Sequence, residues 1–264
     1  MSSAPAPGRL GFAAALGIFL GLLWLERRRP LRVRVEASAR RPLRNAALGI
    51  VTAAVVAALE TPIVARFADL AERRNVGLVR RLPISPLAAK VLALLLLDYT
   101  LYLWHILLHR VPFLWRAHLV HHADLDLDAT TALRFQFVEF LWSIPWRAAQ
   151  VVLIGVPRRT LALWERLTLA EVVFHHSNLR LPARVERVLC RIVETPRLHG
   201  IHHSTRADER DSNYSSGLSL WDDLHGTARR DVPQAGITIG LPEYREPQHL
   251  GWCLLRPLAG TKLD

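Results

Sequence analysis

Long apolar runs constrain the fold of this chain more than any other feature, because a helix needs about 20 such residues to cross the hydrocarbon of a bilayer. Runs close to this length occupy residues 10–25, 46–65, 87–108 and 137–156. A fifth stretch, residues 161–174, contains Glu165, Arg166 and Glu171, so we expect it to fold back on the fourth run as a hairpin around Pro157. The sequence therefore predicts an all-α fold, an integral-membrane helical bundle of about four spans.

Arginine supplies almost all of the positive charge. The formal net charge is +11 although hydrophobic residues make up 51% of the chain, and its lysines are Lys90 and Lys262. Residues 27–44 carry eight arginines, which by the positive-inside rule places this connection in the cytoplasm. Four more arginines at residues 73–81 fall on the opposite connection, where we expect an interfacial helix with snorkelling side chains. The sequence shows no zinc-finger, RNA-binding or basic-zipper pattern, so no nucleic-acid partner is expected.

The whole chain, residues 1–264, reads as a single membrane domain in three parts. Residues 1–86 hold a short polar leader (residues 1–8), two apolar runs and the basic connection. The first run is followed by Glu26 and three arginines where a cleavage site would need small residues, so we expect a retained anchor. Residues 87–227 hold the histidine-rich region, and residues 228–264 form a C-terminal tail. Long apolar runs end before Arg180, which predicts a cytosolic helical cap that holds the histidines.

The most informative polar residues are the 12 histidines, ten of which fall into four clusters. Positions i, i+3 and i+4 share one face of a helix, so the three spaced clusters can each aim two or three imidazoles at one point. Ten imidazoles are too many for one tetrahedral zinc and suit two metals of higher coordination number. Imidazole binds iron, copper, zinc and nickel alike. The clusters are His105 with His109; His118, His121 and His122; His175 with His176; and His199, His202 and His203.

Other features narrow the kind of site. Cys190 and Cys253 do not form a C-x-x-C pair, so a thiolate-based metal site is not expected. His225 and His249 stand apart and read as ordinary residues. The first histidine cluster lies at the end of the third run, where a metal just below the membrane surface could reach a lipid. A membrane metal transporter and an inactive scaffold remain as alternatives. A transporter would place ionisable residues near the middle of several spans, and a scaffold would have lost some of its histidines.

From residue 98 to residue 227 the chain resembles the fatty acid hydroxylase/sterol desaturase superfamily. The resemblance rests on the order and spacing of the histidines and on the residues that flank them. It departs from the family at residues 134–139, where Arg-x-His-Pro-x-Glu is usual, at Ser215, where glycine is usual, and at His225, where an aromatic residue is usual. The matching text is Asp98-Tyr99, His105-x3-His109, Leu114-Trp115-Arg116-x-His118-x2-His121-His122, Arg134, Glu139, His176-Ser177-Asn178, Thr195-Pro196-Arg197-x-His199-x2-His202-His203-Ser204, Asn213-Tyr214, Leu220-Trp221-Asp222 and Gly226-Thr227.

The resemblance implies a membrane oxidoreductase that holds two iron ions and uses O2 to hydroxylate or desaturate a lipid (fatty acyl, sterol or related). All ten clustered histidines are candidate ligands, with His176 preferred over His175 because it matches the family histidine before Ser-Asn. Asp98, Asn213 and Asp222 are expected to orient the metal-binding imidazoles without binding the metal themselves. For Asp98 the alternative is a buried polar group paired with an arginine. Electrons must come from a ferredoxin, cytochrome or reductase, because no dinucleotide fingerprint or haem domain occurs. Arginine in place of lysine and alanine-rich spans indicate a bacterial inner membrane, with the metal site facing the cytoplasm.

Overall fold

The computed structural model describes residues 9–36 and 38–259, and the side chains among them from residue 15 onward. The leader expected at residues 1–8 lies outside this part. Within it, the regular structure is helical and the only bridges are two isolated ones, Pro30 with Leu179 and Ser204 with Ile239, so the predicted all-α fold is confirmed. The helices are α1 (Arg9–Arg28), α2 (Arg40–Val55), the π-helical turn η1 (Val56–Glu60), α3 (Thr61–Arg73), α4 (Leu78–Arg81), α5 (Pro86–Arg110), α6 (Pro112–His122), the 3-10 helix η2 (Ala129–Leu133), α7 (Phe137–Ile154), α8 (Arg158–His176), α9 (Ala183–Leu189), α10 (Pro196–His202), α11 (Ala207–Arg210), α12 (Leu220–His225), the 3-10 helix η3 (Gln234–Gly236) and α13 (Leu250–Leu255).

Three helical segments of the described chain are long and apolar enough to cross a membrane: Arg40–Arg81, Pro86–Arg110 and Phe137–Ile154. They correspond to the second, third and fourth runs of the sequence, and α1 covers the first. Large apolar side chains on the outside of these segments, such as Ile50, Leu87 and Leu153, are each 71% exposed. Water disfavours so much apolar surface, whereas lipid accepts it. The protein therefore associates with a membrane through this bundle.

The second span is longer than the sequence suggested. Its helix runs from Arg40 to Arg73, beyond the expected end of the run at residue 65, and passes Pro62 on the way. Proline lacks a backbone donor and its ring crowds the carbonyl four residues earlier. The π-helical turn Val56–Glu60 widens the helix directly before Pro62, so the chain continues without a break.

The expected hairpin between the fourth and fifth stretches is present. Helix α7 ends at Ile154 and is capped by Gly155, whose φ of 80° is left-handed, and α8 begins at Arg158 after Pro157. Gly77 packs against this turn so closely that a Cβ on it would lie 2.2 Å from the Cα of Gly155. Below the turn, α3, α5, α7 and α8 enclose an apolar core that includes Val64, Leu97 and Trp164.

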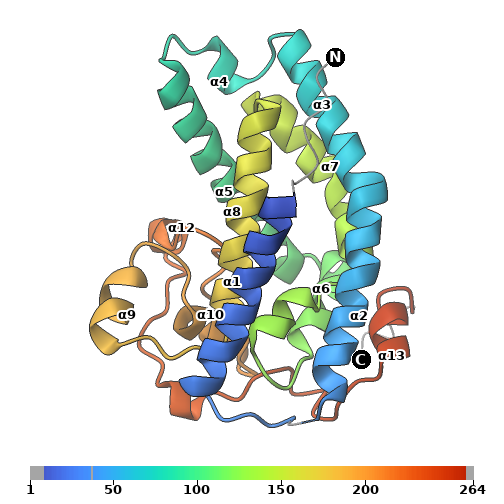
Figure 1. Cartoon of the computed structure of the whole chain (residues 1–264), viewed down its shortest axis with the longest axis vertical. Coiled ribbons are helices and arrows are strands. Elements are labelled where there is room, and N and C mark those ends of the chain that lie inside the picture. Colours follow the sequence, from blue (N-terminus) through green and yellow to red (C-terminus); the bar gives the residue numbers. More distant parts are fainter. Residues whose placement is uncertain (1–8, 37, 260–264) are drawn as a thin grey trace.

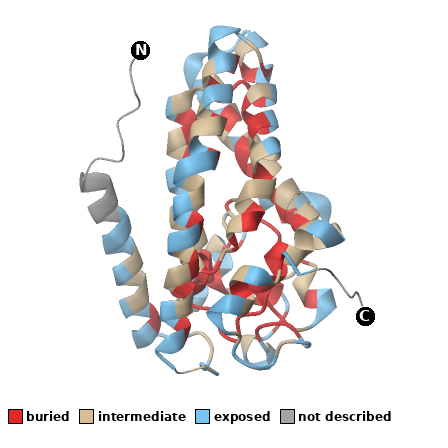
Figure 2. Cartoon of the chain, turned by 90° about the vertical axis from the view of Figure 1, so that its right-hand side faces the viewer, coloured by how far each residue is buried: buried red, intermediate tan, exposed pale blue. Residues whose placement is uncertain are grey.

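The molecule has two parts along its length (Figure 1). The upper part holds α3, α4 and the ends of α5, α7 and α8 that lie away from the histidines, and the lower part holds α6, α10 and the loops that surround them. Buried residues gather in the lower part, while the outer faces of the bundle are largely exposed (Figure 2). The buried polar residues of this lower part include all the clustered histidines except His109, whose side chain is nevertheless only 1% exposed.

Candidate metal centre

The clustered histidines come from the ends of four helices that meet in the lower part of the molecule. His105 and His109 lie in the last turns of α5, and His118, His121 and His122 in α6. His175 and His176 end α8, and α10 carries the last cluster with His203 as its C-cap residue. Short helices that begin at Pro112 and Pro196 thus turn the chain back so that each cluster faces the others.

Nine of the ten histidines form two groups, in each of which the candidate ligand atoms lie within 4.8 Å of one another. Each H-x2-H-H cluster divides between them: its first and last histidines belong to one group and its middle histidine belongs to the other. The stacked rings of His122 and His203, with centroids 4.3 Å apart, bring the two groups together. The first group is His105, His109, His118, His122 and His202; the second group is His121, His176, His199 and His203.

Short distances between Nε2 atoms show that the imidazoles of each group converge. In the second group the Nε2 atom of His176 lies 2.9 Å from that of His121 and 3.0 Å from that of His199. His203 and His199 bring their Nε2 atoms to 3.1 Å. In the first group the Nε2 atoms of His105 and His118 are 3.2 Å apart.

The outer ring nitrogens are held by the protein. The Nδ1 atom of His118 lies 3.0 Å from a carboxylate oxygen of Glu139, and that of His176 lies 2.7 Å from the carbonyl of Val172. Acceptors at Nδ1 fix the proton on that atom and leave the Nε2 lone pair directed into the group. The resemblance included Glu139, but its role was not predicted, because its partner His118 lies on another helix.

A short loop orients two further imidazoles. The carbonyl of Ser212 lies 2.8 Å from Nδ1 of His202, and that of Tyr214 lies 2.6 Å from Nδ1 of His105. Between them, Asn213 adopts a left-handed φ of 48° that lets the two carbonyls face their histidines.

Two of the expected orienting residues act on this loop. Asn213 donates to the carbonyls of Leu198 and Arg229, and its side-chain oxygen accepts from the amide of Arg229. The carboxylate of Asp222 accepts from the amides of Tyr214 and Ser215, at 2.8 and 2.9 Å. Both residues therefore reach the histidines through the backbone of the loop.

The third orienting residue, Asp98, has different partners from those expected. Its carboxylate accepts from the indole of Trp221 at 2.7 Å and from the amide of Leu218 at 3.0 Å. None of its hydrogen bonds within the described chain reaches an imidazole or an arginine. Its side chain lies two turns of α5 away from His105 and fastens α12 to α5 instead.

His175 stands outside both groups. Its ring lies beside those of His199 and His176, with centroids 4.1 and 4.6 Å away, yet its nitrogens do not join the ligand atoms of either group. The geometry agrees with the preference for His176. His225 lies against Tyr99, and His249 caps α13, and neither is a member of the two groups.

Electrostatics favour the neutral form of six histidines that lie outside the spans. Burial, followed by the charge of neighbouring histidines, holds the pKa of five of them well below its ordinary range, and burial lowers the pKa of the sixth, His176, to about 3. Neutral imidazole is the form that binds a metal. Buried ring nitrogens of His109, His122 and His202 also lack a hydrogen-bond partner within the described chain, which suits atoms that face a metal ion. The five histidines whose pKa is held well below the ordinary range are His121, His122, His199, His202 and His203.

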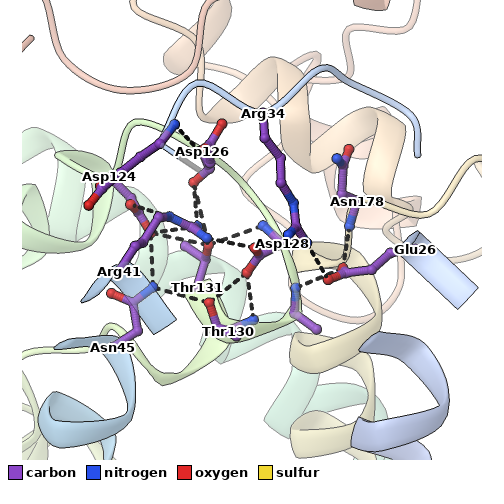
Figure 3. A network of polar contacts seen from close by, with 12 residues as sticks. Glu26, Arg34, Arg41, Asn45, Asp124, Asp126, Asp128, Thr130, Thr131 and Asn178 are labelled. Atoms are coloured by element: carbon purple, nitrogen blue, oxygen red, sulfur yellow. Dashed lines mark hydrogen bonds and ion pairs between the residues drawn. The ribbon is translucent and has the colours of Figure 1, made fainter. Parts of the chain in front are cut away.

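A buried polar network anchors the loop that follows His121 and His122 (Figure 3). The guanidinium of Arg41 donates to both carboxylate oxygens of Asp124 at 2.9 Å and to Asp128 at 2.6 Å. Burial alone would raise the pKa of Asp124, but Arg41 and other arginines outweigh it and lower this pKa to about 2.

The network also reaches the end of α8. The carboxylate of Glu26 accepts from the amides of Ala129 and Asn178, at 3.0 and 2.9 Å. Asn178 follows His176 by two residues, so the N-terminal segment of the chain is tied to the loops after two of the histidine clusters (Figure 3).

Comparison with known proteins places this geometry in a family. The model of the fatty acid hydroxylase family matches residues 90–227, which contain all ten clustered histidines. No solved structure gives a significant match.

Among known proteins, the chain is similar to three enzymes named for lipids. It is 32% identical to the ornithine lipid hydroxylase OlsE of Rhizobium tropici over 57% of this chain and 45% of that one. It is 31% identical to an alkylglycerol monooxygenase of Xenopus tropicalis over 49% of this chain and 28% of that one. It is 32% identical to a cholesterol 25-hydroxylase-like protein of Danio rerio over 51% of this chain and 53% of that one. The chain thus spans about half or less of the length of these relatives. On the family match and the two histidine groups able to hold metal, it belongs to the fatty acid hydroxylase family.

Proposed function

We propose that the chain is an O2-dependent di-iron oxidoreductase that hydroxylates or desaturates a membrane lipid. The observation that carries this proposal is the convergence of nine buried imidazoles into two adjacent groups at the lower end of the apolar bundle. Each group would hold one iron ion. Three relatives named for lipid hydroxylation or monooxygenation support the choice of reaction and of substrate class.

The distances within the groups fit metal ions of high coordination number. Two imidazoles in neighbouring positions at right angles around one metal, each about 2.1 Å from it, place their nitrogens ~3.0 Å apart. Tetrahedral angles at the same bond length would place them ~3.4 Å apart. The separations of 2.9, 3.0 and 3.1 Å in the second group agree with the first arrangement, and the separation of 3.2 Å in the first group lies between the two. The groups also offer five and four nitrogens, which exceeds the three protein ligands of a catalytic zinc.

Bound iron would supply the reactivity toward an unactivated C–H bond, while the residues of the chain supply position and environment. Glu139 and the carbonyls of Ser212 and Tyr214 hold three imidazoles of the first group in one tautomer and orientation. The burial of both groups keeps bulk water from the reacting carbon. A lipid chain from the adjoining bilayer would therefore meet a rigid, dry site.

The electrons would come from a separate protein, a ferredoxin, cytochrome or reductase. Hydroxylation places one atom of O2 in the lipid and releases the other as water, which consumes two external electrons. Desaturation likewise needs two electrons from outside. The chain offers no dinucleotide fingerprint and no haem ligand pattern to supply them.

The proposed location is the inner membrane of a bacterium, with the histidines at the cytoplasmic surface. The connection between α1 and α2, with its eight arginines at residues 27–44, lies at the same end of the molecule as the histidine groups (Figure 1). The positive-inside rule assigns that end to the cytoplasm. The position of the groups at the ends of the spans also argues against a metal transporter, which would need ligands along the pathway.

Incorporation of labelled oxygen tests the proposed reaction. The chain would be purified in detergent, loaded with iron and returned to membranes that contain the native lipids. A ferredoxin with its reductase would then supply electrons under ¹⁸O2. The proposal predicts a lipid that gains one ¹⁸O atom, or a lipid that loses two hydrogens, and no product from the His121→Ala variant. If iron is bound and no lipid in the extract shows the first change or the second, the proposal is contradicted.

A further inference from the structure

Helix α12 has an unusual polarity for a surface helix in water. Leu220 and Leu224, one turn apart on its outer face, are 51% and 67% exposed. On the side toward the body of the molecule, Asp222 is buried and Trp221 bonds to Asp98 of α5, while the polar residues Asp223 and His225 are exposed beside the leucines. An amphipathic helix that faces water has the reverse arrangement.

Helix α9 and the residues after it repeat this pattern. Val185, Val188 and Ile192 are about half exposed or more, whereas Cys190 and Glu194 are buried. Three exposed arginines alternate with these apolar side chains. Apolar residues that point outward among arginines are typical of a segment that lies in the interface of a bilayer. The arginines are Arg184, Arg187 and Arg191.

The two segments form one unit. The amide of Ser219 donates to the carbonyl of Ile192, and that of Glu194 donates to the carbonyl of Gly217, at 3.2 and 2.8 Å. Arg230 bridges the two segments, because it donates to the carboxylate of Asp223 in α12 and to the carbonyl of Cys190 after α9. We call this unit, residues 183–194 and 217–225, the shelf.

The shelf lies where a bilayer around the bundle would meet it. Figure 1 shows α9 and α12 beside the lower half of α8, projecting sideways beneath the level of the upper bundle. Its five exposed apolar side chains belong to elements at this level of the molecule, beside the apolar spans. The occupant that fits both the apolar side chains and the arginines is the interface of a bilayer with anionic headgroups.

Behind α12, a single layer of packed aromatic rings separates the surface from the first histidine group. The ring of His225 lies 5.2 Å from that of Tyr102, and Tyr102 contacts Tyr214 edge to face at 6.5 Å. Tyr214 in turn lies 5.2 Å from His109. These packed rings, with Tyr102 and Tyr214 buried, are thus what separates the surface of α12 from a candidate metal-binding imidazole.

We infer that the shelf lies in the bilayer interface and that the lipid substrate reaches the first histidine group beside α12. The first part of the inference rests on the polarity of α9 and α12 alone. The second part rests on the proposed lipid oxidation as well.

Fluorescence quenching tests the position of the shelf. Both native cysteines are buried, so a Leu224→Cys variant accepts an environment-sensitive dye at one site. In vesicles of phosphatidylglycerol and brominated phosphatidylcholine, the inference predicts quenching by the bromines and protection from aqueous iodide. The matched control is Val33→Cys, at a residue 93% exposed on the connection at the lower end of the molecule, which should show the opposite pattern. Iodide quenching at residue 224 as strong as at residue 33 would overturn the inference.

Kinetics test the route of entry. Leu224→Glu places a charge in the interface and should raise the KM for the bilayer lipid several-fold, with kcat and bound metal unchanged, whereas Leu224→Met should behave like the unaltered chain. An unchanged KM in Leu224→Glu would overturn the entry route even if the quenching places the shelf in the bilayer. A chain that binds no iron and oxidises no lipid would contradict the proposed function, and the quenching result would still decide where the shelf lies.

Discussion

Truncation of Arg41 is expected to be among the most destabilising single changes in the lower part of the molecule. Its guanidinium is 2% exposed and bonds to Asp124 through two nitrogens and to Asp128 through a third. Arg41→Ala would leave these buried carboxylates without their closest counter-charge. Removal of one partner from a buried ion pair costs about 3–5 kcal/mol. That loss would be a large share of a typical free energy of unfolding of about 5–15 kcal/mol.

Arg41→Lys should recover only part of this free energy, because an ammonium group cannot reproduce the fork of bonds to Asp124. The assay is denaturant unfolding in detergent micelles, followed by tryptophan fluorescence. The matched control is Arg40→Ala, at the neighbouring exposed residue, whose side chain has no ion pair within the described chain and whose loss should cost less than ~0.5 kcal/mol. A loss under ~1 kcal/mol for Arg41→Ala, or an equal loss for both variants, would refute the assigned role of the network.

Three further predictions concern the metal groups. Glu139→Gln weakens the acceptor that orients His118, so metal affinity measured by competition with a chelator should fall by about 10–100-fold; an unchanged affinity would show that the carboxylate does not act through the imidazole. His176→Ala should remove the metal of the second group, whereas His175→Ala should retain it, as elemental analysis of both variants would reveal; equal loss in both would assign His175 as a ligand. Because the pKa of His176 and of its buried neighbours is lowered from the ordinary 6.5, the unfolded metal-free chain takes up protons that the folded chain refuses. Its free energy of unfolding should therefore decrease as pH falls below about 6.5, by up to ~1.4 kcal/mol per pH unit for each such histidine, and unfolding curves that do not change between pH 7 and pH 5 would contradict the neutral assignment.

Much of the bundle was predictable, because hydropathy and helix length act locally. The spans 46–65, 87–108 and 137–156 all correspond to helices of the structure. Local rules were less informative where a change in backbone geometry accommodates a proline inside a helix. The expected span ended at residue 65, shortly after Pro62, but a π-helical turn before this proline allows the helix to continue to Arg73.

In the site, too, features that depend on local spacing were predictable, whereas contacts between distant residues were not. Spacing alone predicted that each H-x2-H-H cluster gathers its imidazoles, but the division of each cluster between two groups depends on how α6 and α10 face each other. The partners of Asp98 and Glu139 could not be read from the sequence, because Trp221 lies 123 positions from Asp98 and His118 lies on a different helix from Glu139. The contact between Glu26 and Asn178, 152 positions apart, was hidden for the same reason.

The central claim is that two irons lie in the two histidine groups, and metal content with Mössbauer spectroscopy on iron-57-loaded, detergent-purified protein tests it most directly. The predicted result is close to two irons per chain with a coupled spectrum. His121→Ala, in the second group, and His202→Ala, in the first, should each lose one iron and the coupling. One iron or none per chain, or a spectrum that neither variant changes, would contradict the account.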